Sequence, residues 1–155
     1  MTIRMRTEAT TITICRRVAV AGTAGMAVLH AAWAAGATWP APDRDQLADL
    51  VVGRRPMPGP GPTGVVVGLL GVTAWAVATV RPPGEGSGGG IESKVARLGA
   101  RVAAAVLVAR GAGGLVASAR ELGRATPTFR HWDLRLYSPA ALGLGLATGV
   151  VAWAR

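Results

Sequence analysis

The feature that most constrains this chain is a set of apolar stretches long enough to cross a lipid bilayer. Residues 18–39 carry no formal charge over 22 positions, which is about 33 Å of α-helix against a hydrocarbon core of about 30 Å. Residues 63–80 also carry no charge, and residues 99–119 and 138–154 form two further apolar stretches. The sequence therefore predicts an all-α fold, an integral membrane bundle of four transmembrane helices.

Composition supports one membrane domain over residues 18–154. Half of the 155 residues are hydrophobic and only 16% are charged, whereas about 25% are charged in soluble domains. A basic tail is expected over residues 1–17. A proline-rich loop, with one short amphipathic helix over residues 45–52, is expected at 40–62, and a glycine-rich loop at 81–94.

The net charge of +9 favours a membrane surface over nucleic acid. The 17 basic residues are spread along the chain, and no nucleic-acid-binding module is recognisable. Basic residues at the ends of spans contact lipid headgroups, so the expected partner is the lipid bilayer and not nucleic acid. Nearly all the basic residues are Arg, and together with abundant Ala and Gly they indicate a bacterial protein of the cytoplasmic membrane.

Four arginines, at positions 4, 6, 16 and 17, precede the first apolar stretch. Because Lys and Arg concentrate in cytoplasmic segments, they predict that both termini lie in the cytoplasm. A cleaved signal peptide is the alternative interpretation of this basic start and apolar run. The length of the run and the further spans behind it favour a true transmembrane helix.

No motif for catalysis or metal binding is recognisable. Cys15 is the only cysteine, which excludes an intramolecular disulfide and a site of several cysteines. There is no HExxH motif, glycine-rich phosphate loop or nucleophile elbow. We therefore expect no catalytic residues, no metal and no cofactor, and a non-enzymatic role is favoured.

Two ionisable residues lie near the middle of apolar stretches, His30 in the first and Arg110 in the third. Such groups are costly in lipid and raise a functional hypothesis. No Asp or Glu lies inside the four stretches, so no counter-ion is evident at that depth. The favoured interpretation is a structural tie between helices, in which His30 accepts a hydrogen bond from Arg110 or each side chain bonds a backbone carbonyl. A ligand or ion site, or an Arg110 side chain that reaches the interface, are the alternatives.

The stretch FRHWDLRLYSPA precedes the fourth apolar stretch and concentrates polar and aromatic residues. We expect Trp132 and Tyr137 to anchor the membrane interface and Asp133 to pair locally with an Arg. Ser138 is expected to cap a helix in which Pro139 is the first residue. A catalytic role for Asp133 lacks a nucleophile at a meaningful spacing.

Glycines recur four residues apart, at Gly64 and Gly68 and again at Gly145 and Gly149. This spacing lets two helix backbones approach closely in lipid. Packing within the bundle is the favoured interpretation, and contact between copies in a homo-oligomer is the alternative.

Three motifs together resemble a known family: HAAWAAGATWP from His30, the Arg110–Gly111 pair, and TPTFRHWDLRLYSP from Thr126. The family comprises small bacterial integral membrane proteins described as the domain of unknown function number three-nine-nine-five. Its members are four-span proteins with H-x-x-W-x-x-G in the first span and D-x-x-x-Y-S-P opening the last. The resemblance covers residues 18–154 and implies that the following positions are characteristic: His30, Trp33, Gly36, Trp39, Arg110, Phe129, Asp133, Tyr137, Ser138 and Pro139.

The chain departs from the family at Gly114, where members often carry an acidic residue after the Arg of the third span. This departure weakens the expectation that Arg110 belongs to a charge-paired site. The resemblance implies location and topology but no activity. Three roles follow, in order of preference: a structural or partner-binding protein that contacts another membrane protein or a second copy, a small-solute or ion permease acting as an oligomer, and an enzyme acting on lipid-like substrates.

Overall fold

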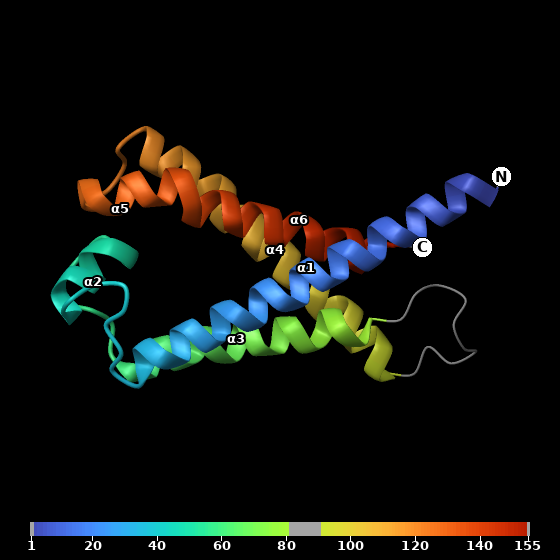
Figure 1. Cartoon of the computed structure of the whole chain (residues 1–155), viewed down its shortest axis with the longest axis horizontal. Coiled ribbons are helices and arrows are strands. Elements are labelled where there is room, and N and C mark those ends of the chain that lie inside the picture. The colour runs from blue at the N-terminus through green and yellow to red at the C-terminus, as the bar shows by residue number, and fades with distance from the viewer. Residues whose placement is uncertain (1, 81–90, 155) are drawn as a thin grey trace.

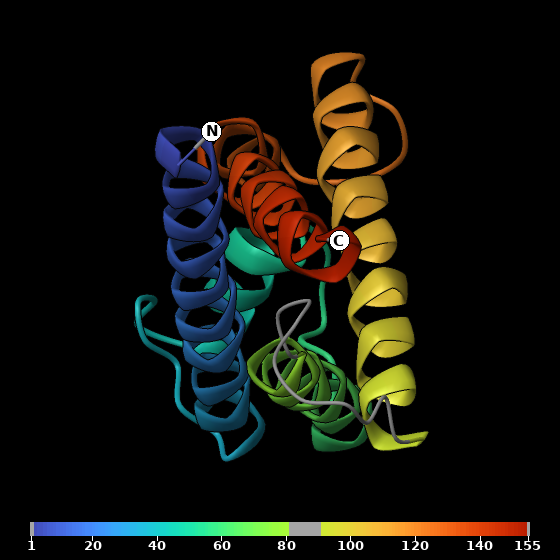
Figure 2. The same cartoon turned by 90° about the vertical axis from the view of Figure 1, so that its right-hand side faces the viewer.

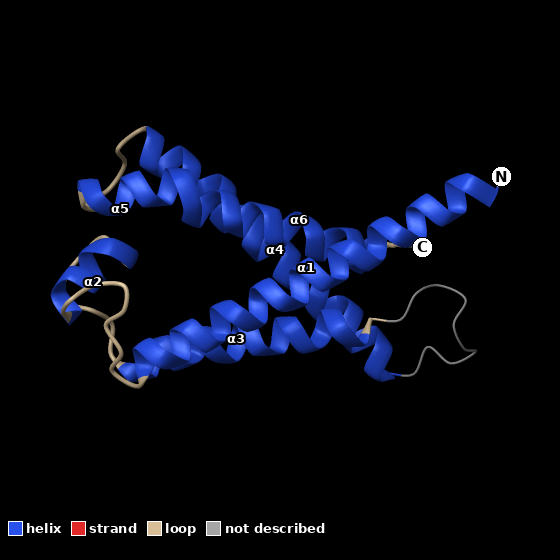
Figure 3. Cartoon of the chain, viewed as in Figure 1, coloured by secondary structure: helices blue, strands red, loops and turns tan. Residues whose placement is uncertain are grey.

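The computed structural model of the chain describes residues 2–80 and 91–154, and within these ranges all regular structure is helical (Figure 3). The helices are α1 (Thr2–Ala34), α2 (Arg44–Val51), α3 (Pro60–Thr79), α4 (Ile91–Ala119), α5 (Pro127–Trp132), the π-helical turn η1 (Asp133–Tyr137) and α6 (Ser138–Trp153). Four helical runs are long and apolar enough to cross a membrane. The expected all-α fold with four transmembrane helices is confirmed.

Three of the long helices begin earlier in the sequence than expected. The basic N-terminal segment is helical from Thr2 and continues α1. Residues 91–94, expected in the glycine-rich loop, form the start of α4, while residues 81–90 of that loop lie outside the described residues. The last transmembrane helix begins at Pro127 because α5, η1 and α6 form one continuous run.

The four long helices form a ring in the order α1, α3, α4, α6 (Figure 2). The main packing pairs are α1 with α3 and α4 with α6. The pairs cross near the end that holds both termini and diverge toward the opposite end, where α2 and α5 lie (Figure 1). Helices α1 and α4 are diagonal, and no contact joins them in the described part of the chain.

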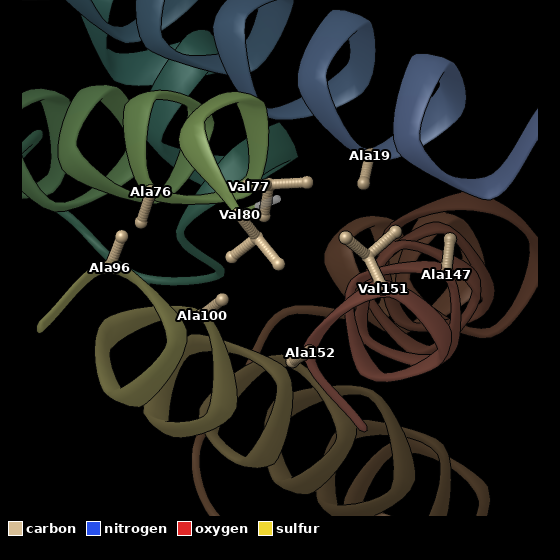
Figure 4. Close-up of a cluster of buried hydrophobic side chains, with 9 residues drawn as sticks. All are labelled: Ala19, Ala76, Val77, Val80, Ala96, Ala100, Ala147, Val151 and Ala152. Atoms are coloured by element: carbon tan, nitrogen blue, oxygen red, sulfur yellow. The ribbon is translucent and has the colours of Figure 1, made fainter. Parts of the chain in front are cut away.

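The buried core lies where the two pairs cross, and it consists mainly of alanine and valine (Figure 4). Ala19 of α1, Val77 of α3, Ala100 of α4 and Val151 of α6 are each at most 1% exposed. Lipid supplies little hydrophobic drive for helices to associate, so small side chains that permit close backbone approach carry the packing. This explains why the buried members of this cluster are alanines and valines.

Glycines let the backbones of α4 and α6 pack closely against each other. A Cβ on Gly111 would lie 2.6 Å from the Leu142 backbone nitrogen, and one on Gly145 would lie 2.7 Å from that of Val108. The expected packing role is therefore confirmed for Gly145. A Cβ on Gly64 or Gly68 would meet nothing within 4 Å, so this pair faces away from the bundle and its role between copies stays a prediction.

The short helix expected in the proline-rich loop is present as α2. Asp43 caps it by accepting a hydrogen bond of 2.8 Å from the Gln46 backbone nitrogen, and this bond holds the pKa of the Asp43 carboxyl below its usual range. At the other end, the Thr126 hydroxyl donates to the Asp49 carbonyl and the Thr126 nitrogen to the Gly53 carbonyl, each at 2.9 Å. These bonds hold α2 against the start of α5.

Candidate functional site

The first family motif forms the end of a helix. Gly36 has φ +103°, a left-handed conformation suited to glycine. Its nitrogen donates to the Trp33 carbonyl at 3.1 Å, and the Ala37 nitrogen donates to Ala32 at 2.9 Å, which is the Schellman pattern. The Trp33 indole then donates to the Trp39 carbonyl at 2.8 Å. The prediction that the first helix extends to Trp39 is therefore wrong, because Gly36 stops it.

His30 does not contact Arg110. Its Nδ1 lies 2.8 Å from the Met26 carbonyl one turn earlier, and its ring packs edge-on against Trp33 at 5.0 Å between centroids. Helices α1 and α4 make no contact in the described ranges. The expected tie between His30 and Arg110 is therefore wrong, and His30 belongs to the same helix end as Trp33.

The third family motif, which begins at Thr126, lies mostly inside a helix and not before one. Thr126 is the N-cap, since its hydroxyl accepts from the Phe129 nitrogen at 3.3 Å, and Pro127 follows as the first helical residue. The prediction that Ser138 caps the fourth helix is therefore wrong. The capping and proline signals at Thr126 and Pro127 begin this helix about three turns earlier.

The π-helical turn has a physical reason in Pro139. This residue has no N–H, and its ring would press on the carbonyl four residues earlier in a regular α-helix. In η1 the Ser138 nitrogen instead donates to the Asp133 carbonyl, five residues back. Positions five apart differ by about 140° around an α-helix, whereas the wider turn places both on one face. The turn therefore directs Asp133 and Ser138 together toward α4.

Arg110 meets both of these side chains from α4. Its Nη2 donates to Asp133 Oδ1 at 2.8 Å, and its Nη1 donates to Ser138 Oγ at 3.0 Å. The Ser118 hydroxyl donates to Asp133 Oδ2 at 2.6 Å. Asp133 is 1% exposed and Ser138 is fully buried. The expected local pairing of Asp133 at the interface is wrong, because its partner lies 23 residues earlier in the chain.

Gly114 provides the space for this network. A Cβ built on it would overlap both Arg110 Nη1 and Ser138 Oγ. The expectation that Gly114 weakens a charge-paired site is therefore wrong. Asp133 supplies the carboxylate from the facing helix, and the glycine leaves room for Arg110 to reach it.

An open pocket of about 600 Å³ lies beside the network. Its apolar wall includes Val51 from α2, Ala117 from α4 and Phe129 from α5, and its polar wall includes Arg110 and Asp133. The Arg110 side chain is 45% exposed in spite of its ion pair. A charged group from the transmembrane region is therefore presented to a partly apolar pocket.

Arg130 also lines this pocket. Its Nη2 donates to the carbonyls of Glu121 at 3.3 Å and Gly123 at 3.2 Å, and its buried Nε finds no hydrogen-bond partner among residues 2–80 and 91–154. Its Nη1 lies 3.4 Å from a carboxylate oxygen of Glu121, whose side chain is 78% exposed. Two guanidinium groups thus border one pocket whose lining contains a single carboxylate, that of Asp133.

The remaining motif residues have structural positions. The ring of Phe129 lies 6.0 Å from that of Tyr137 and packs against Gly53 after α2.

Among residues 2–80 and 91–154, no group of three or more His, Cys, Asp or Glu side chains is placed to hold a metal ion. Sequence reasoning missed Ser118; its one signal is a polar residue about two turns after Arg110 on an apolar helix.

The comparisons with known proteins agree with the geometry. The family model described as "Protein of unknown function (DUF3995)" matches residues 23–148, which include all three motifs and the pocket network. No curated protein and no solved structure matches the chain. The resemblance seen in the sequence is confirmed: the chain belongs to the DUF3995 family, as a multi-pass membrane protein with four apolar helices.

Proposed function

We propose that this chain is a membrane-embedded binding protein whose pocket takes a small amphiphile with an anionic, oxygen-rich head. The observation that carries the proposal is the Arg110 side chain, which is 45% exposed, pairs with Asp133 and lines the pocket. The proposal narrows the partner-binding role expected from the sequence to a small-molecule partner.

The hydrogen bonds of Arg110 support a ligand with acceptor oxygens. Its bonds to Asp133 and Ser138 use two N–H groups, and a guanidinium has about five. Within a membrane, an unsatisfied donor costs free energy because lipid offers no acceptor. A carboxylate or phosphate oxygen in the pocket would satisfy the remaining donors, and a guanidinium binds such groups strongly.

The charges that line the pocket favour an anion. Arg110 and Arg130 contribute two positive charges, and Asp133 contributes one negative charge. The carboxylate that pairs with Arg130 belongs to Glu121, which is exposed and does not line the pocket. An anionic head therefore meets a net positive surface, at a place where the low dielectric strengthens the attraction.

The walls of the pocket suit the hydrocarbon part of the ligand. Val51, Ala117, Leu122 and Phe129 present apolar groups. The volume of about 600 Å³ lies within the range of small-molecule sites, about 300–1,000 Å³. A ligand with a short hydrocarbon chain and one anionic group fits both surfaces.

The proposal includes the membrane that holds the protein and the orientation of the chain in it. We place the protein in the bacterial cytoplasmic membrane with both termini in the cytoplasm, on the basis of the basic residues before the first span. Because α2 lies at the opposite end from the termini (Figure 1), the pocket then faces the outer leaflet. Reporter fusions at residues 50, 86 and 125 test this orientation, and a cytoplasmic signal at residue 50 would overturn it.

Binding is tested with 11-(dansylamino)undecanoic acid, a fluorescent carboxylate amphiphile, in phosphatidylcholine nanodiscs. Gly113 lines the pocket, and a Cβ there meets nothing within 4 Å, so Gly113→Leu fills the pocket without disturbing the ion pair. Gly64→Leu is the matched control, since its Cβ is equally free on α3. We expect saturable binding that Gly113→Leu and Arg110→Met abolish and Gly64→Leu retains. Equal binding by all four proteins would contradict the proposal.

Two outcomes would replace the proposal with another function. Accumulation of the probe inside proteoliposomes, lost in Gly113→Leu, would identify a permease. Turnover of a phospholipid that is lost in a folded Asp133→Asn variant would identify an enzyme. We expect neither, because a binding protein holds its ligand without transport or chemical change.

A further inference from the structure

We propose that an apolar groove between α4 and α6, which begins next to the pocket at Val108 and extends from there to Trp153, holds an acyl chain of an anionic phospholipid. The groove has a volume of about 530 Å³, and its lining includes Ala105 and Val108 from α4 and Gly145, Gly149 and Trp153 from α6. None of these residues lines the pocket beside Arg110. The two sites are therefore separate.

Small residues, Ala104 and Ala105 on α4 and Gly145 and Gly149 on α6, line the groove and leave space in it. A Cβ on Gly145 would lie 2.7 Å from the Val108 backbone nitrogen, so this position admits no side chain at the present helix separation. Leu146 and Val150 border the groove and are 58% and 41% exposed. A hydrocarbon chain laid between these walls gains van der Waals contacts, which are the main source of affinity between apolar surfaces in lipid.

A cationic group marks one end of the groove. Arg101 belongs to the same face of α4 as Ala104, Ala105 and Val108, since these positions are three, four and seven residues apart. Its guanidinium carbon lies 5.7 Å from the centroid of the Trp153 ring. A tryptophan and an arginine at the end of an apolar surface are typical of the headgroup region.

The orientation of Arg101 leaves it available to a phosphate. Its Nε donates to the Ala152 carbonyl at 3.3 Å, near the end of α6. This bond fixes the plane of the guanidinium beside Trp153. The residue is exposed, so its two Nη groups can donate to a phosphodiester oxygen while Trp153 contacts the glycerol region.

The length of the groove suits a phospholipid whose headgroup lies at the membrane surface and whose acyl chain points toward the membrane centre. Arg101 and Val108 are separated by about 10 Å along the helix, so a chain that starts beside Arg101 extends along the groove toward the membrane centre. Charge complementarity selects an anionic headgroup: a zwitterionic lipid carries a compensating ammonium, whereas phosphatidylglycerol carries a net negative charge.

The test is native mass spectrometry of the full chain with equimolar phosphatidylglycerol and phosphatidylcholine of identical acyl chains. We expect bound phosphatidylglycerol to exceed phosphatidylcholine, and Arg101→Gln to lower that ratio about fivefold, the equivalent of about 1 kcal/mol. Arg101→Lys keeps the charge and should retain the preference. Arg17→Gln is the matched control, because it removes one exposed arginine from the same end of the bundle.

A second variant tests the groove itself. Ala105 is exposed within the groove, so Ala105→Phe fills it without altering the core, and we expect both lipids to bind less. The proposal is overturned if Arg101→Gln changes the lipid ratio no more than Arg17→Gln, or if Ala105→Phe leaves lipid binding unchanged. Neither residue lines the pocket, so binding of the dansyl probe should persist in both variants.

Discussion

Replacing Asp133 with alanine removes the acceptor on which the polar network depends. Two donors lose their partner, Arg110 Nη2 at 2.8 Å and Ser118 Oγ at 2.6 Å. The hydroxyl bond contributes about 1 kcal/mol. Breaking a fully buried ion pair costs about 3–5 kcal/mol of stability. The Arg110 side chain is 45% exposed, and solvent screens its charge, so the loss of this ion pair should cost only about 1–2 kcal/mol. The free energy of unfolding should therefore fall by about 2–3 kcal/mol.

The assay is thermal unfolding in a mild detergent, followed by circular dichroism. At about 2–4 °C per kcal/mol for a chain of this size, the midpoint should fall by about 5–10 °C. A double-mutant cycle with Arg110→Met isolates the pair, and we expect a coupling of about 1–2 kcal/mol. The outcome that refutes the reasoning is simple additivity of the two single losses.

The matched control is an ion pair on the surface. Asp45 lies 3.8 Å from Arg55, and the two side chains are 64% and 52% exposed. Exposed pairs contribute little because water already solvates both charges. A cycle over Asp45→Ala and Arg55→Met should give a coupling below about 0.5 kcal/mol, and a value as large as that for Asp133 would show that burial is not the cause.

Three further predictions concern individual positions. Gly36→Ala forces a side chain into a left-handed conformation and should lower the free energy of unfolding by about 1 kcal/mol. Gly25→Ala is the control: a Cβ at Gly25 meets no neighbouring atom within 4 Å, so this substitution should raise the free energy of unfolding by about 0.5–1 kcal/mol. Equal shifts of the melting temperature in the two variants would contradict this prediction. Gly111→Ala places a Cβ against the facing backbone and should cost about 1–3 kcal/mol, while Gly113→Ala should cost nothing, as thermal unfolding will show. The Asp43 cap has a lowered pKa, so its stabilisation is present above the ordinary Asp pKa and is lost as pH falls through the lowered value. Asp43→Asn keeps the cap without titrating, so melting temperatures of the two proteins should diverge only in acid.

The long apolar helices were predictable because each carries its own signal. α3 is free of charge from its first turn to its last, so a hydropathy argument locates it without reference to the rest of the chain. For the end of the first helix, the sequence predicts that Gly36 is a characteristic position but not that the helix stops there. The family motif marks the position, but the role of Gly36 as a helix stop becomes clear only from the bonds of Trp33 and Ala37.

The candidate site was not predictable, because it depends on residues far apart in the sequence. The charged neighbours of Asp133 predict a place at the membrane interface and a local partner. The Asp133 carboxylate can be buried only because Arg110 supplies the opposite charge and Gly114 leaves space for the Arg110 side chain. The π-helical turn adds a second obstacle, since regular helical periodicity places Asp133 and Ser138 on different faces. The pattern within each segment therefore predicts the wrong partner for Arg110.

The central claim is that Arg110 presents positive charge to an open pocket, and thiol labelling tests it most directly. In a Cys15→Ala background, Gly113→Cys places a thiol in the pocket wall. We predict that a methanethiosulfonate reagent carrying a sulfonate reacts faster with this thiol than one carrying a trimethylammonium group. Arg110→Met should remove the difference between the two rates. Bound dansyl probe should protect the thiol from both reagents. A cysteine that is inert to both reagents, or that reacts equally with both while Arg110 is present, would contradict the account.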